Sequence, residues 1–277
     1  MPAVAHYPQP PAGKSGRPDR AVQSDPFHCH FVLVLFQATR YGSIVGLLSE
    51  GVHPMIAIVI RTAASALVLL ALSLGWTSAQ ERHQPGRFDF YVLALSWSPS
   101  FCKDMEERGR EAREQCGVAR PYSFVVHGLW PQYERGFPRD CQVPAPRLDR
   151  NIMKSMLDLM PAPRLVYREW DSHGTCSGFA PQAYFDLVRK ARGAVKIPEI
   201  YSAPKATLTV TPDEVEEAFV KDNPGLSRAG IAVTCGGTRL GEIRICMTKD
   251  LRFRDCDEID RRACRRDKLF MPPVRGG

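Results

Sequence analysis

The sequence predicts an α+β fold with a mostly antiparallel central sheet, flanked by helices and stapled by disulfides. Apolar strand-like segments and amphipathic helical segments follow one another without the regular alternation that builds a parallel sheet. Eight of the nine cysteines lie beyond residue 100, and an even set in one region predicts four disulfides. No repeat, low-complexity tract or clear linker interrupts residues 80–277, so we expect one domain there.

The predicted strands are short segments rich in aromatic and β-branched residues. Residues 88–97 (FDFYVLALSW) are predicted as a central strand. Residues 123–130 (SFVVHGLW) are predicted as a second strand that runs into a turn at Gly128. Residues 230–235 and 241–248 are predicted as a pair of neighbouring strands near the C-terminus.

The predicted helices show charged or amphipathic patterns with helical spacing. They cover residues 103–114, 149–160, 164–173, 181–192 and 212–221. Gly174 is expected to end the third of these helices. Thr211 and Glu214 have the spacing of a capping box at the start of the last helix.

Residues 55–79 have the pattern of a secretory signal peptide. Arg61 supplies positive charge, an uncharged apolar run follows from Thr62 to Trp76, and small residues end at Ala79. The run is short for a membrane span. Cleavage after Ala79 would remove Cys29 and keep the other eight cysteines, which agrees with export to an oxidising compartment. We therefore expect a secreted or periplasmic protein, with no stable membrane association after cleavage.

Residues 1–54 do not fit an ordinary leader, because a signal peptide stands at the true N-terminus. We interpret them as a non-native or disordered extension and expect translation to start at Met55. The alternative is a real cytoplasmic extension on a membrane-anchored structural protein, with residues 30–76 as its anchor. N-terminal sequencing of the mature protein separates the two interpretations.

The net charge of +7 and the sequence pI near 9.0 suit a polyanionic partner such as RNA, although many secreted domains are mildly basic. A zinc site is the alternative use of the cysteines. The sequence has no CxxC pair, and the closest cysteine spacing is Cys256 to Cys264. We therefore expect neither a metal nor another cofactor.

Two motifs carry possible chemistry. HGLWP, at residues 127–131, places a histidine after a strand, and REWDSHGTC occupies residues 168–176. On a helix, Glu169 and His173 would share a face, where the carboxylate can orient and charge the imidazole. The plainer interpretations are a structural histidine beside a core tryptophan and an ion pair at the end of a surface helix.

Together these motifs resemble the paired active-site signatures of the ribonuclease T2 family, HGLWP and an HEWxKHGTC-like segment. FYVLALSWSPSFC (90–102) and CGGTRLGEIRIC (235–246) also resemble segments of that family, and the resemblance covers about residues 85–265. It implies a metal-independent endoribonuclease with low base specificity that cleaves single-stranded RNA. The products would carry a 2′,3′-cyclic phosphate, and DNA, which has no 2′-OH, would be inert.

The resemblance also implies roles for individual residues. His173 would be the general base, His127 the general acid and Glu169 the supporting carboxylate. Trp130 would contact a base of the substrate. Arg168 stands where the family has a histidine and is expected to bind phosphate. Ser172 replaces a lysine, so either Arg168 supplies the missing charge or turnover is slower.

The resemblance pairs Cys141 with Cys176, and it leaves three further pairs as a hypothesis. These are Cys102–Cys116, Cys235–Cys264 and Cys246–Cys256, although sequence alone permits other connectivities. We expect Trp97 and Trp170 in the core and the basic segment 261–268 on a solvated face. We expect a monomer. The alternative function is a catalytically weakened homologue that binds RNA or a protein partner, which an RNA cleavage assay in chelator would reveal.

Overall fold

A computed structural model of the protein describes residues 83–117 and 121–275, which belong to one compact unit, Gln80–Gly277. The predicted signal peptide and the extension before it lie outside the described residues. None of the helices in the described ranges is both long and apolar enough to cross a membrane.

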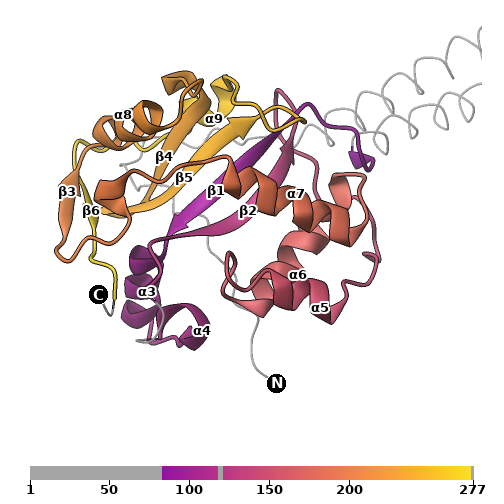
Figure 1. Ribbon diagram of the computed structural model, residues 1–277, viewed down its shortest axis with the longest axis horizontal. Helices are drawn as coiled ribbons and strands as arrows, with labels where there is room; N and C mark the ends of the chain where they lie inside the picture. Colours follow the sequence, from indigo (N-terminus) through magenta and orange to yellow (C-terminus); the bar gives the residue numbers. More distant parts are fainter. Residues whose placement is uncertain (1–82, 118–120, 276–277) are drawn as a thin grey trace, which may run out of the picture. The chain divides into compact units, whose positions relative to one another are not determined.

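A mixed sheet forms the centre of the unit (Figure 1). Its strands lie in the order β2-β1-β5-β6-β3, and β4 also pairs with β5. Their bounds are β1 Phe90–Trp97, β2 Phe124–Gln132, β3 Leu208–Val210, β4 Ile231–Gly236, β5 Arg239–Met247 and β6 Leu269–Met271. The predicted α+β class is confirmed. Every pairing is antiparallel except that of β5 with β6, which is parallel and was not predicted.

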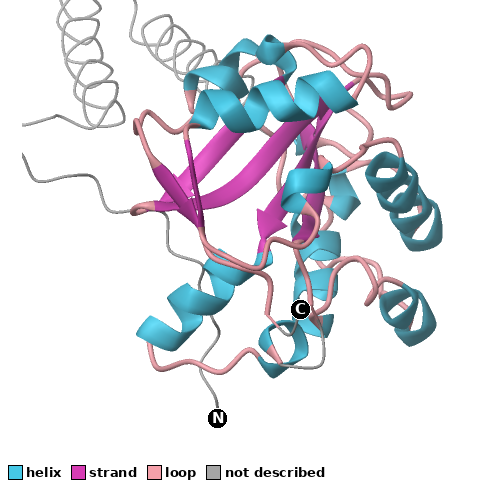
Figure 2. Ribbon diagram, turned by 60° about the vertical axis from the view of Figure 1, so that its left-hand side comes forward, coloured by secondary structure: helices cyan, strands magenta, loops and turns pink. Residues whose placement is uncertain are grey.

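The helices gather around this sheet (Figure 2). Helices α6 and α7 contact β2, α5 packs against α6 and α7, and α8 and α9 contact β4. Their bounds are α3 Ser98–Glu107, α4 Arg113–Cys116, α5 Arg150–Ser155, α6 Pro163–Ser172, α7 Pro181–Gly193, α8 Pro212–Asp222 and α9 Asp257–Arg261. Short 3-10 turns lie at η2 Gly174–Cys176, η3 Glu199–Tyr201 and η4 Arg228–Gly230. The capping box predicted for α8 is present, with Thr211 and Glu214 bonded reciprocally.

Two predicted helices differ from the structure. The segment predicted at 103–114 forms α3 and α4, because Gly109 takes a left-handed φ of 62° and ends the first helical run. The segment predicted at 149–160 is helical only in α5. Beyond Met156 the chain turns, and the Leu159 carbonyl accepts the backbone N–H of Val126 at 2.9 Å. Bonding to β2 therefore competes with continuation of the helix.

The predicted turn at Gly128 is also wrong, because β2 continues to Gln132. The register instead shifts at this place. Ala94 of β1 pairs with Gly128 and Leu95 pairs with Val126, so His127 is an extra residue in β2. Such a β-bulge disturbs the ladder locally and re-aims one side chain, and bulges are common beside active sites.

Alternate residues of the strands face two different apolar clusters. The main core contains Leu93 and Leu95 of β1 with Ile243 and Ile245 of β5. Trp97 and Trp170 are fully buried in this core, as the sequence predicted. The opposite face carries a smaller cluster of buried residues, namely Phe90, Val92, Ala232, Cys246, Cys256 and Ile259. Trp130 packs against this second cluster, so its side chain lies on the face away from the main core.

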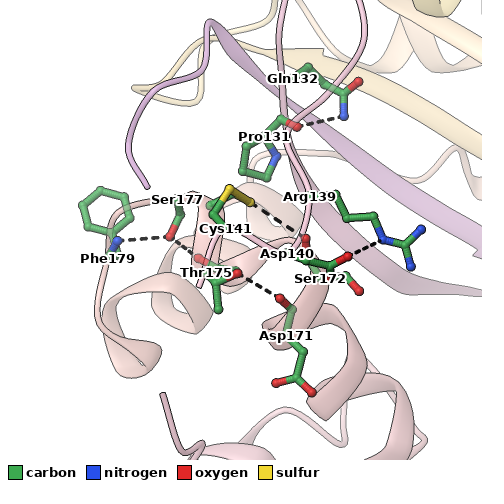
Figure 3. The surroundings of a disulfide bond; sticks show 12 residues. Pro131, Gln132, Arg139, Asp140, Cys141, Asp171, Ser172, Thr175, Ser177 and Phe179 are labelled. Carbon is green, nitrogen blue, oxygen red and sulfur yellow. Dashed lines mark hydrogen bonds and ion pairs between the residues drawn. A yellow bond between two sulfur atoms is a disulfide. The ribbon is translucent and has the colours of Figure 1, made fainter. Parts of the chain in front are cut away.

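Four disulfides are present, and they join the pair that the family resemblance implied and the three further pairs that were a hypothesis. They are Cys102–Cys116, Cys141–Cys176, Cys235–Cys264 and Cys246–Cys256. Cys141–Cys176 connects the loop after β2 to η2, directly behind the end of α6. The surroundings of this bond are drawn in Figure 3.

Removing Cys141–Cys176 is expected to destabilise the protein. The bond spans a sequence separation of 35 residues, and its loss frees that loop in the unfolded chain. The double variant Cys141→Ala/Cys176→Ala should lose about 2–4 kcal/mol of unfolding free energy. Urea unfolding measures this loss, and a free-thiol titration verifies that the other three pairs remain closed. An unchanged unfolding midpoint would contradict the expectation.

Candidate active site

The β-bulge places His127 beside the neighbouring strands of the sheet. Its Nδ1 pairs with Oε1 of Glu242, a residue of β5 that is 115 positions away in sequence. Glu242 is 6% exposed and is itself held by Arg244, whose Nε and Nη2 donate to Oε2 at 3.2 and 3.0 Å. Ser96 of β1 also donates to Oε1, at 3.2 Å. Strand β5 therefore supplies the carboxylate that holds one side of the imidazole.

The other nitrogen of His127 faces helix α6. Nε2 lies 3.7 Å from Oε1 of Glu169, which is 4% exposed. The second carboxylate oxygen of Glu169 accepts a hydrogen bond of 2.7 Å from Nε1 of Trp130. Glu169 thus joins α6 to β2 and faces the imidazole nitrogen that Glu242 does not occupy.

Gly128 makes this approach of α6 to β2 possible. A Cβ at this position would lie 2.1 Å from Oε2 of Glu169 and 2.3 Å from Nε1 of Trp130. Neither distance is compatible with a real side chain. The glycine of the HGLWP motif is therefore required by the space around the Glu169–Trp130 hydrogen bond rather than by a turn.

The sequence predicted that the Glu169 carboxylate supports His173, but the described side-chain contacts of Glu169 go to His127 and Trp130. The physical reason is the end of α6. The helix stops at Ser172, and His173 has φ −124° and ψ −43°, which departs from the helical path. The His173 N–H still donates to the Glu169 carbonyl at 3.0 Å, so at this C-cap the two residues are linked through the backbone.

One tryptophan brings the two histidines together. The ring of Trp130 lies 5.2 Å from that of His127 and 5.5 Å from that of His173, measured between ring centroids. The guanidinium of Arg244 lies 5.2 Å from the centroid of the same indole. The two imidazoles, 46 positions apart in sequence, thus border a single half-buried side chain.

His173 lies in surroundings unlike those of His127. Its Nδ1 is buried and has no hydrogen-bond partner within the described part of the chain. Phe137 lies 6.5 Å away, again between ring centroids. The charged groups that act on this imidazole are cations, whereas carboxylates flank His127.

Those cations include the predicted Arg168 and also Arg139, which the sequence did not single out. Arg139 pairs with Asp140 at 3.3 Å, and the Asp140 N–H donates to the Ser172 carbonyl at 3.0 Å. Figure 3 shows Arg139 and Asp140 beside Ser172. The loop before Cys141 is therefore bonded to the end of α6, and Arg139 on this loop adds positive charge near His173.

Opposite electrostatic effects act on the two histidines. Burial alone would lower the pKa of His127, but the carboxylates of Glu242 and Glu169 outweigh it and raise this pKa to about 9. Burial lowers the pKa of His173 to about 3, helped by the positive charges of His127, Arg139 and Arg168. At neutral pH the first imidazole is therefore protonated and the second is neutral.

The two carboxylates also differ. Burial tends to raise the pKa of Glu242, but His127 and Arg244 lower it to about 2. Burial raises the pKa of Glu169 despite the opposing effect of His127 and the Trp130 hydrogen bond. His127 and Arg244 thus favour the ionised form of Glu242, whereas burial favours the protonated form of Glu169. No cluster of three or more potential metal-ligating side chains occurs among residues 83–117 and 121–275.

Sequence reasoning identified His127, Trp130, Arg168, Glu169 and His173 and missed Glu242 and Arg244. A signal for these two was present. In GEIRIC, Glu242 and Arg244 alternate with isoleucines, which places both polar side chains on one face of a strand. Nothing in the sequence shows that this face meets His127.

The fold is shared with solved ribonuclease structures. The structure of RNase NT in complex with 5′-AMP matches with a TM-score of 0.54 and 25% sequence identity. The match covers 68% of this chain and 99% of that one. The two molecules therefore share the α+β fold over a length that corresponds to most of the described part of this chain.

The chain belongs to the Ribonuclease T2 family, whose family model matches residues 88–256. A ribonuclease of Aeromonas hydrophila is 40% identical over 129 residues, which cover 46% of this chain and 56% of the relative. A probable ribonuclease of Haemophilus influenzae is 30% identical over 178 residues, which cover 61% of this chain and 61% of the relative. The matches thus span a little over half of the length of these two relatives.

Proposed function

We propose that the protein is an endoribonuclease that cleaves single-stranded RNA by acid–base transphosphorylation. The observation that carries the proposal is the contrast between the imidazoles of His127 and His173, which border the same indole, that of Trp130. His127 is held protonated between two carboxylates, and His173 is kept neutral by burial and nearby cations. A proton donor and a proton acceptor beside one substrate site are what this reaction requires.

In the proposed reaction, His173 removes the proton of the ribose 2′-OH, and the 2′-oxygen attacks the adjacent phosphorus. The bond from phosphorus to the 5′-oxygen breaks, and His127 gives its Nε2 proton to that leaving oxygen. The products are a 2′,3′-cyclic phosphate and a 5′-OH end. Glu169 faces the reacting nitrogen of His127, and Arg168 is proposed to bind the phosphate.

Trp130 is proposed to contact a base of the RNA. Its indole is half-buried, and a stacked base would add ~1–3 kcal/mol with little dependence on sequence. Further support comes from the relatives, two of which are named ribonucleases, and from RNase NT, whose structure contains 5′-AMP. We expect DNA not to be cleaved, because it has no 2′-OH to act as the nucleophile.

The deciding experiment is cleavage of a homopolymer single-stranded RNA in the presence of EDTA, with analysis of the new ends. We expect 2′,3′-cyclic phosphate and 5′-OH ends, and no cleavage of the matching DNA. Ends with 3′-OH and 5′-phosphate would overturn the mechanism. Tight RNA binding without cleavage would favour the alternative of a weakened homologue that only binds.

The pH dependence of kcat/KM should be a broad bell. The general acid His127 must be protonated, so activity should fall as the pH rises through its pKa of about 9. The general base His173 must be neutral, so activity should fall as the pH drops towards its pKa of about 3. Burial raises the pKa of Glu169, so its protonation adds to the acid-side loss. A basic limb near pH 6 would contradict this assignment.

We infer that the protein is exported and matures by cleavage after Ala79. Four disulfides support an oxidising compartment, and residues 55–79 have the pattern of a leader. N-terminal sequencing of the purified mature protein should find Gln80 as the first residue. A start well before Gln80 would contradict this cleavage, and recovery in a membrane fraction would favour an anchored form.

A further inference from the structure

Glu242 has no assigned role, although it is the most completely bonded carboxylate near the two histidines. Its Oε1 pairs with Nδ1 of His127 and accepts from Ser96, and its Oε2 accepts twice from Arg244. Its backbone is also fixed, since the Glu242 N–H donates to Oγ1 of Thr234 at 3.1 Å. A buried carboxylate held on every side can fix the orientation of the group it binds.

We propose that Glu242 is a positioning residue for the ribonuclease reaction, holding Nδ1 of His127 protonated so that Nε2 faces the substrate and Glu169. The proposal rests on the proposed function and assigns it a residue from outside both signature motifs. The observation that carries the proposal is that the two carboxylates face different nitrogens of the His127 ring. Glu242 bonds the remote nitrogen of the ring, whereas Glu169 lies 3.7 Å from the reacting nitrogen and is partly engaged by Trp130.

This division resembles the logic of a buried carboxylate behind a catalytic histidine, in which the carboxylate fixes the tautomer and stabilises the charged imidazole. Arg244 has a matching task. It neutralises the side of Glu242 that His127 does not contact, and it packs over Trp130. Glu242 therefore lies between two partners, His127 on one oxygen and Arg244 on the other.

The charged groups that face His127 predict how the imidazole responds when Glu242 loses its charge. Glu242 and Glu169 favour the protonated ring, while burial and the cation Arg244 oppose it, and His173 is a further titratable neighbour. In Glu242→Gln, Arg244 would also lose its partner and repel the imidazolium more strongly. The protonated form of His127 should therefore become less stable, and its orientation less fixed.

The test compares Glu242→Gln with Glu216→Gln as a matched control. Glu216 is another buried carboxylate, 5% exposed, paired with Arg228 at 3.2 Å and bonded to the Val233 N–H at 3.1 Å. It lies on α8, outside the histidine site. Both variants lose one buried charge next to an arginine, so general destabilisation should affect both.

We expect Glu242→Gln to shift the basic limb of kcat/KM down by at least one pH unit. We also expect kcat to fall about 10- to 100-fold with little change in KM, while Glu216→Gln keeps the wild-type profile. Glu242→Asp should restore part of the shift. An unchanged profile and rate in folded Glu242→Gln would overturn the proposal, as would the same shift in Glu216→Gln.

NMR of the His127 ring gives a readout that needs no RNA, and the tautomer of the wild-type ring is measured without any variant. In the wild-type protein above pH 9, the neutral ring should be the Nδ1–H tautomer, and the titration midpoint should drop in Glu242→Gln. An Nε2–H tautomer in the wild type would overturn the proposal. If the wild type shows the expected tautomer but cuts no RNA, the proposed function fails while the positioning contact stands.

Discussion

Replacing His173 by alanine should lower kcat on single-stranded RNA by ~10²–10⁴-fold without unfolding the protein. The variant removes the neutral imidazole proposed to take the 2′-OH proton, and no other neutral base borders Trp130 among the described residues. The same loss is expected for His127→Ala, because the leaving 5′-oxygen would then receive no proton. Initial rates on a homopolymer RNA and circular dichroism of the folded variants measure both effects.

His83→Ala is the matched control for these two variants. His83 is exposed, and its ring contact is with Tyr133 at 6.3 Å between centroids. The His83→Ala variant should therefore cleave RNA at the wild-type rate. Normal turnover by His173→Ala or His127→Ala would remove that residue from its proposed role, and equal losses in all three variants would indicate an effect unrelated to catalysis.

The second large effect is expected for Gly128→Ala, which adds a single methyl group. That methyl would lie 2.1 Å from the Glu169 carboxylate and 2.3 Å from the Trp130 N–H. The hydrogen bond between them must break or move, and Glu169 must retreat from His127. A displacement of about 1 Å in a catalytic group can cost about 100-fold, so we expect a loss of that size in kcat/KM.

Gly193→Ala provides the comparison for Gly128→Ala. Gly193 ends α7, and a Cβ there would meet nothing within 4 Å. This variant should keep both its activity and its stability. A Gly128→Ala protein with wild-type kcat/KM would show that the contact between α6 and β2 can widen without affecting the reaction.

Local patterns were sufficient to predict most of the fold. The strands at β1, β4 and β5 and the helices α6, α7 and α8 have clear apolar spacing, caps or breakers, and each lies close to its predicted range. Strands β3 and β6 were missed because each has only three residues, too few to show alternation. Their pairing joins segments about sixty residues apart, which local patterns do not reveal.

The site residues that lie in the two short motifs were predicted from the sequence. The site residues and contacts that depend on tertiary structure were missed. His127, Glu169 and His173 lie in the two motifs, but the partner of Glu169 depended on where α6 ends. The β-bulge at His127 arises from the register between β1 and β2, and the HGLWP sequence instead suggested a turn. Glu242 reaches His127 only because β5 lies next to β1 in the sheet.

The alternation of side chains along β5 has a practical consequence for protein engineering. Ile243 and Ile245 are fully buried in the main core, whereas Glu242 and Arg244 point to the histidine site from the same few residues of chain. Randomising the two isoleucines and screening for thermal tolerance would vary the core. Randomising the two charged positions and screening for activity would vary the histidine site. On this one strand, stability can thus be altered at the odd-numbered positions and activity at the even-numbered positions, nearly independently of each other.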